Sequence, residues 1–123
     1  MKITGFCPII VTKDPETIMK TFEDLGFERR HTKKDIEGGS NTNYNMKDAN
    51  GNRINIASSE HIPQDLTAVN INVDNFQEAY DFFIAHGFVN PRGDKVTDTS
   101  SARATMLFSP SGFAVNIIEH IKK

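Results

Sequence analysis

The sequence predicts an α+β fold made of two tandem modules, each with the element order βαβββ. The first observation behind this prediction is a repeat. Gly51 and Gly112 stand at similar turns and lie 61 residues apart, and Gly26 and Gly87 have the same spacing. A second is that each half carries a β-branched segment, then an amphipathic segment ended by glycine, then a hairpin. The same spacing of 61 residues aligns a helix, its last residue and a hairpin of the first half with those of the second half. This indicates a single structural unit that occurs twice.

The first module occupies residues 1–59. Apolar, β-branched Ile3–Val11 predicts a strand, and Asp14-Pro15-Glu16 supplies an N-cap, a proline and an early acid for a helix that ends at Gly26. The apolar side of that helix is expected at Ile18, Met19, Phe22 and Leu25. Further strands are expected at Phe27–Thr32, Tyr44–Lys47 and Arg53–Ala57. The polar segment Lys33–Asn43 is either a loop or a frayed strand end, and it could act as a lid.

The linker and the second module occupy residues 60–123, and both modules together form one predicted domain over residues 1–123. Alternating Leu66–Asp74 predicts a strand, and Asn75 with Glu78 predicts a capping box at the start of a helix that ends at Gly87. The apolar side of this helix is expected at Ala79, Tyr80, Phe82 and Phe83. The remaining expected elements are a short strand at Phe88–Pro91, a loop at Arg92–Ser101, and two strands within Ala102–His120 joined by a Ser-Pro-Ser-Gly turn.

Bulk composition excludes several classes of protein. The chain has 14 basic and 16 acidic residues, so it lacks the basic excess typical of nucleic-acid binding. No apolar run approaches the roughly 20 residues that a membrane span needs, and the first residues do not resemble a secretion signal. One cysteine, Cys7, cannot form an internal disulfide, which favours the cytoplasm.

Alternation along the strands predicts which face of each sheet the helix covers. Val69, Ile71 and Val73 alternate with polar or small residues, so the helix is expected on their side. The opposite face then carries Ala68, Asn70 and Asn72, and the offset of 61 residues gives the matching positions in the first module. If the two opposite faces meet, they enclose the concave side of a cup-shaped mixed sheet with the helices on its outer face.

The residues expected to line this concave cleft combine apolar groups with asparagines and one arginine. Such a mixture suits a small organic ligand held by a few directed hydrogen bonds. The alternative is a half-polar sheet face that is simply exposed to solvent. The predicted ligand-binding residues are Cys7, Ile9, Arg53, Asn55, Ala68, Asn70, Asn72, Asn116, Ile118 and His120.

Three segments resemble the vicinal oxygen chelate superfamily, which includes glyoxalase I, the bleomycin resistance proteins and extradiol dioxygenases. They are VTKDPETIMKTFEDLGF, DANGNRINI and SPSGFAVNIIE. The resemblance covers essentially the whole chain and implies that two modules pair into a cup. A chain this short is most similar to the bleomycin resistance type, which implies a homodimer.

The resemblance also implies where a metal would be bound. The matching positions are Cys7 or its neighbour Phe6, Asn55, Ala68 and Asn116, and none is an imidazole or a carboxylate. We therefore expect no metal and no cofactor, and a protein that sequesters a small organic ligand without binding nucleic acid or membrane. A metal-dependent lyase or dioxygenase with non-standard ligands remains an alternative, as does a structural or regulatory protein whose cleft is collapsed.

Overall fold

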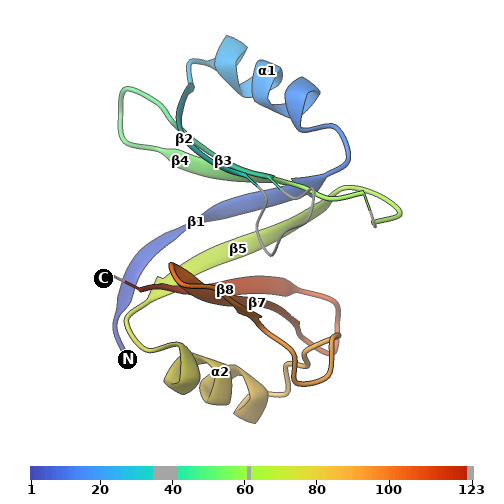
Figure 1. Ribbon diagram of the computed structural model, residues 1–123. Coiled ribbons are helices and arrows are strands. Elements are labelled where there is room, and N and C mark those ends of the chain that lie inside the picture. The colour runs from blue at the N-terminus through green and yellow to red at the C-terminus, as the bar shows by residue number, and fades with distance from the viewer. Residues whose placement is uncertain (35–41, 61, 122–123) are drawn as a thin grey trace. The chain divides into compact units, whose positions relative to one another are not determined.

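The computed structural model describes residues 1–34, 42–60 and 62–121 (Figure 1). Its elements confirm the α+β class and the predicted βαβββ order of both modules. None of the helices in the described part of the chain has the length and apolar character needed to cross a membrane. The elements are, in chain order, β1 Ile3–Thr12, α1 Pro15–Leu25, β2 Glu28–Lys34, β3 Thr42–Lys47, β4 Arg53–Ser58, β5 Leu66–Val73, α2 Phe76–Ala85, β6 Thr97–Asp98, β7 Ala102–Phe108 and β8 Ala114–His120.

The chain divides into two compact units. The N-terminal unit is Cys7–Thr67, and the C-terminal unit combines Met1–Phe6 with Ala68–Lys123. Strand β1 is therefore divided between them. Its first residues are fixed in the C-terminal unit, because the Lys2 N–H donates to Oδ1 of Asp74 over 2.6 Å and the Asp74 N–H donates to the Lys2 carbonyl over 3.0 Å.

In the N-terminal unit, the strands lie in the order β2-β3-β4-β1, with β1 parallel to β4 and the other pairs antiparallel. Helix α1 covers one face of β2, β3 and β4 (Figure 1). The expected apolar side of α1 is wrong at Leu25, which is 71% exposed because it is the last helical residue before Gly26 turns the chain away. The core consists of Met19, Met46, Ile54 and Ile56, surrounded by Ile10, Ile18, Phe22, Phe27 and Tyr44.

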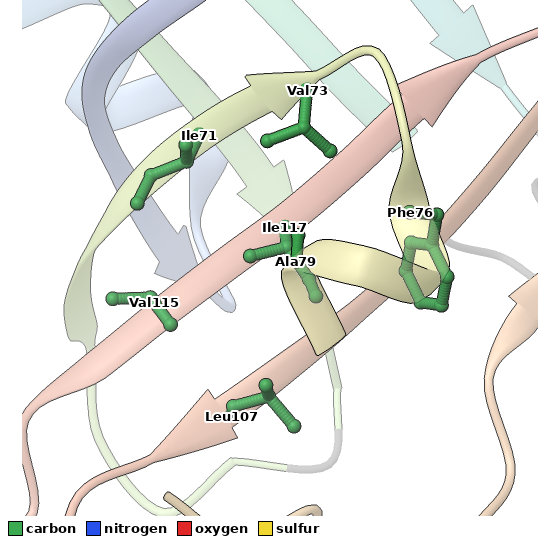
Figure 2. Packing of buried hydrophobic residues seen from close by; sticks show 7 residues of the cluster. All are labelled: Ile71, Val73, Phe76, Ala79, Leu107, Val115 and Ile117. Atoms are coloured by element: carbon green, nitrogen blue, oxygen red, sulfur yellow. The ribbon is translucent and has the colours of Figure 1, made fainter. Parts of the chain in front are cut away.

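In the C-terminal unit, the strands lie in the order β5-β8-β7-β6, with β5 parallel to β8. Figure 2 shows side chains from β5, β7 and β8 converging on Phe76 and Ala79 of α2. The expected apolar side of α2 is wrong at Phe82, which is 46% exposed and stacks on His86, whereas Phe76 is buried. The core residues are Ile71, Val73, Phe76, Ala79, Leu107, Val115 and Ile117.

Strand pairing repeats with the same offset as the sequence. Ile9 pairs with Asn55 in the N-terminal unit, and Asn70 pairs with Asn116 at the corresponding place in the C-terminal unit. The glycines at both helix ends and both hairpin turns have positive φ angles, which only glycine adopts at little cost. The duplication therefore extends from sequence to backbone register.

Both predicted helix N-caps are confirmed. Asp14 Oδ1 accepts from the Thr17 N–H over 3.2 Å, and Asn75 Oδ1 accepts from the Glu78 N–H over 3.0 Å. The capping box at α2 is only half formed, because the Glu78 carboxylate pairs with the N-terminal ammonium of Met1 instead.

The strand expected at Phe88–Pro91 is wrong. It is reduced to one bridge between Val89 and Phe108, and Pro91 lacks the N–H that a continuing ladder would need. The strand paired with β7 lies instead within the expected loop, as β6 at Thr97–Asp98. The second module therefore keeps its element order with the short strand moved along the chain.

Candidate ligand-binding face

The C-terminal unit places a group of polar side chains on the sheet face opposite α2. Ile71 and Val73 pack under α2, so their neighbours Asn70 and Asn72 point to the other side. Pairing along β5, β8 and β7 extends this surface across three strands. We call it the asparagine face, and it comprises Ala68, Asn70, Asn72, Ala104, Met106, Asn116, Ile118 and His120.

Three asparagines on this face are joined by hydrogen bonds between their side chains. Asn116 Nδ2 donates to Asn70 Oδ1 over 2.7 Å, and Asn70 Nδ2 donates to Asn72 Oδ1 over 3.3 Å. Asn70, in the middle, is only 7% exposed. A buried amide must have hydrogen-bond partners, and here its two neighbours supply them. We call this chain of three side chains the amide chain.

The two ends of the amide chain keep hydrogen-bonding capacity. Within the described residues, no hydrogen bond is found for Oδ1 of Asn116 or for Nδ2 of Asn72. Each end amide therefore still offers N–H groups and a carbonyl oxygen. Reversing all three amides would preserve the two bonds and would still leave both kinds of group at the ends.

Gly5 provides room for one end of the amide chain. A Cβ atom at this position would lie 2.9 Å from Asn72 Nδ2 and 3.3 Å from Asn72 Cβ. The first of these distances is too short for real atoms, so any larger residue at position 5 would displace the Asn72 amide. Sequence reasoning missed Gly5, because nothing in the sequence places this part of β1 beside Asn72.

Apolar side chains flank the amide chain. Met106 is paired directly with Asn116, Ile118 is paired with Asn72, and both are half-buried. Ala68, at the start of the face, is 2% exposed. Directed amide groups beside small and flexible apolar groups match the usual make-up of a small-molecule site. Met106 was not predicted, although its alternation with buried Leu107 could have indicated it.

The predicted residues of the N-terminal unit also share a sheet face. Ile54 and Ile56 lie in the core under α1, so Asn55 points away from the helix, beside buried Ile9 of β1. Asn45 of β3 is paired with Asn55 and was missed by the sequence reasoning. Cys7 is half-buried and Arg53 is exposed. In this unit the strand pairings align Ile9, Asn45 and Asn55 across β1, β4 and β3.

Charge differs between the two faces. Arg53 is paired with Lys47, which places two cations at one end of the N-terminal face. The asparagine face has no lysine, arginine, aspartate or glutamate, and His120 is its one titratable residue among the described members defined above. Its hydrogen-bonding groups are therefore neutral amides.

The residues do not fit the metal site that the resemblance implies. Ala68 has no donor atom, and the Asn116 amide is already bonded to Asn70. Across the part of the chain that is described, no group of three or more histidine, cysteine, aspartate or glutamate residues comes together. Divalent metals such as zinc need several strong donors in a fixed geometry, which these positions do not supply.

The two histidines whose side chains are described lie on different elements. His86 caps α2, with Nδ1 2.7 Å from the Phe82 carbonyl oxygen, and His120 is exposed at the end of β8. The side chains of His31 and His61 lie outside the described residues, as does most of Lys33–Asn43, the segment predicted as a possible lid.

Solved structures share this fold. A glyoxalase/bleomycin resistance protein/dioxygenase superfamily member from Vibrio splendidus 12B01 aligns with a TM-score of 0.62 and 16% identity, over 96% of this chain and 99% of that one. Methylmalonyl-CoA epimerase from Mycobacterium tuberculosis aligns with a TM-score of 0.69 and 12% identity, over 98% of this chain and 90% of that one. Glyoxalase I from Zea mays aligns with a TM-score of 0.69 and 17% identity, over 98% of this chain but only 44% of that one.

These similarities define the class of fold. No protein-family model and no curated protein matches the sequence. The chain has the vicinal oxygen chelate fold, which is the fold that the resemblance noted in the sequence implied. Because the fold supports many chemistries, function must be argued from the face itself.

Proposed function

We propose that this protein is a metal-free small-molecule-binding protein that holds an organic ligand on its asparagine face. The observation that carries the proposal is the amide chain of Asn116, Asn70 and Asn72, whose middle member is buried while its ends keep hydrogen-bonding capacity. A ligand bound there would gain directed hydrogen bonds at the amides and apolar contact at Met106 and Ile118.

Burial argues against the alternative of a face that is merely solvated. Asparagines in contact with bulk water bond mainly to water, whereas Asn70 bonds to two protein amides and is almost completely covered. Ala68 and Ala102 on the same side of the sheet are also buried. The middle of the face is therefore covered by the protein itself, and a ligand would contact its half-buried members Asn72, Met106, Asn116 and Ile118.

The second candidate is a metal-dependent lyase or dioxygenase, the alternative that the family resemblance implies, and one structurally similar protein is named glyoxalase I. The donor set described above disfavours it. The homodimer, the cytoplasmic location and a cleft shared by the two modules remain predictions from the sequence.

Thermal-shift screening followed by calorimetry, over antibiotics and aromatic metabolites, tests the proposal. We expect at least one saturable ligand whose affinity falls about tenfold or more in Asn70→Ala and in Asn116→Ala, since each change removes part of the amide chain. Gln77→Ala is the matched control, because it removes an exposed side-chain amide on α2. Affinities that both asparagine variants leave unchanged would refute the assignment of the site.

A further inference from the structure

We infer that the ligand presents a neutral carboxamide or lactam group to the ends of the amide chain. This inference rests on the proposed function and narrows it to a chemical class. It follows from the hydrogen-bonding capacity, the charge and the apolar flanks of the asparagine face.

Hydrogen-bonding capacity is the first part of the argument. Asn116 still has a carbonyl oxygen and a second N–H to offer, and Asn72 has its amide N–H groups. A carboxamide or lactam carries a donor and an acceptor side by side, so it can satisfy both kinds of group at one end amide. A carboxylate only accepts and would leave the asparagine oxygen unpaired, which is costly in a partly desolvated place.

Charge gives the second part. No lysine or arginine stands among the defined members of the asparagine face, and these members are all described. A carboxylate or phosphate bound at the amide chain would lose water without a lysine or arginine on this face to serve as a countercharge. A neutral amide avoids this penalty and keeps the same shape.

The amide chain itself gives the third part. Asn70 receives a hydrogen bond from Asn116 and donates one to Asn72, so the three dipoles point in one direction. Hydrogen bonds arranged in this way polarise one another and strengthen the next bond in line. The half-buried Met106 and Ile118 then provide contact for the apolar body of the ligand.

Three small aromatic probes separate the possibilities: benzamide, N,N-dimethylbenzamide and benzoate. Dimethylation removes the N–H donors, and benzoate replaces the amide by an anion. The readout is the side-chain ¹⁵N–¹H₂ NMR signals of Asn70, Asn72 and Asn116 in the intact chain, each assigned by its alanine variant. We expect benzamide to shift these signals saturably and to bind about tenfold more tightly than either other probe.

Each outcome decides the inference. Equal or tighter binding of benzoate or N,N-dimethylbenzamide, with shifts at the same asparagines, would overturn the amide class and leave the proposed function standing. No saturable shift with any probe would overturn the class as well, and the wider ligand screen would then decide the function independently. Asn116→Asp adds a check, because it keeps the shape but introduces a charge and should weaken benzamide about tenfold, whereas Gln77→Ala should change nothing.

Discussion

The side-chain amide of Asn116 donates to Oδ1 of Asn70 over 2.7 Å, although the two residues lie 46 positions apart in the sequence. Parallel pairing of β5 and β8 places them side by side, and alternation turns both away from α2. Because the two amides bond to each other, this sheet face differs from a polar face whose side chains bond only to water.

Removing Asn116 should destabilise the protein as well as weaken binding. Asn116→Ala leaves the buried Asn70 oxygen without its partner, which typically costs about 1–3 kcal/mol. The free energy of unfolding in urea measures this loss. The exposed control Gln77→Ala should change stability by no more than about 0.5 kcal/mol. Equal losses in the two variants would mean that the amide chain adds no stability.

Gly5→Ala should displace the Asn72 amide and cost about 1–3 kcal/mol of stability, as overpacking does. The φ angle of Gly5 is not among the positive ones, so backbone strain does not explain such a loss. In an Asn72→Ala background, the Gly5→Ala change should cost clearly less, because the contacting nitrogen is gone. A double-mutant cycle by urea unfolding measures the coupling, and a cycle that shows none would contradict the steric account.

Stability should fall in acid partly through Asp14. The Thr17 hydroxyl, followed by the Thr17 N–H, donates to the Asp14 carboxylate and lowers its pKa below the ordinary value of 3.8. A pKa that is lower in the folded state gives stability that is present above the ordinary value and is lost as the pH falls through the folded value. Asp14→Asn retains a capping oxygen without the titration, so its melting temperature should fall less between pH 7 and pH 3. An unchanged pH dependence in Asp14→Asn would refute this role.

Metal analysis should separate a binding protein from a metal enzyme. Protein purified without an affinity tag should contain no stoichiometric zinc, nickel or iron, and dialysis against a chelator should leave its melting temperature unchanged. The physical reason is the donor set, since Ala68 and the bonded Asn116 amide stand where strong ligands would be needed. A stoichiometric ion that is lost in Asn116→Ala would overturn the proposed function.

Truncating Phe76 and Phe82 should have very different effects, although both lie on α2. Phe76 is only 1% exposed and lies under the Arg103 guanidinium, 4.9 Å from ring centroid to Cζ. Phe76→Ala should cost about 3–5 kcal/mol and Phe82→Ala no more than about 1 kcal/mol. Urea unfolding compares the two, and similar losses would contradict the described packing of α2.

Local patterns in the sequence predict most of this fold. Helix N-caps at Asp14 and Asn75, the paired glycines and the alternation around Asn70 each depend on neighbours in the chain, so a linear reading finds them. The exposure of Phe82 was not predicted. The apolar residues of this helix are so closely spaced that the sequence alone does not determine which of them face the sheet. In the structure Phe76 is buried and Phe82 is exposed.

The candidate site was predictable only in part. Alternation correctly placed Asn70, Asn72 and Asn116 on one face, but their hydrogen bonds depend on strand register, which the sequence does not determine. Gly5 lies against Asn72 from a distant segment of the chain, and Asn45 is paired with Asn55 by the register of the β3–β4 hairpin. Their roles therefore required the structure.

Because the first strand is divided, the sequence repeat and the compact unit are different stretches of chain. A fragment cut at the repeat boundary, residues 60–123, would lack Lys2 beside Asp74 and Gly5 beside Asn72. Truncation at that boundary therefore does not reproduce the compact C-terminal unit. A usable half would need Met1–Phe6 joined to Ala68–Lys123, with the intervening residues replaced by a connection of suitable length.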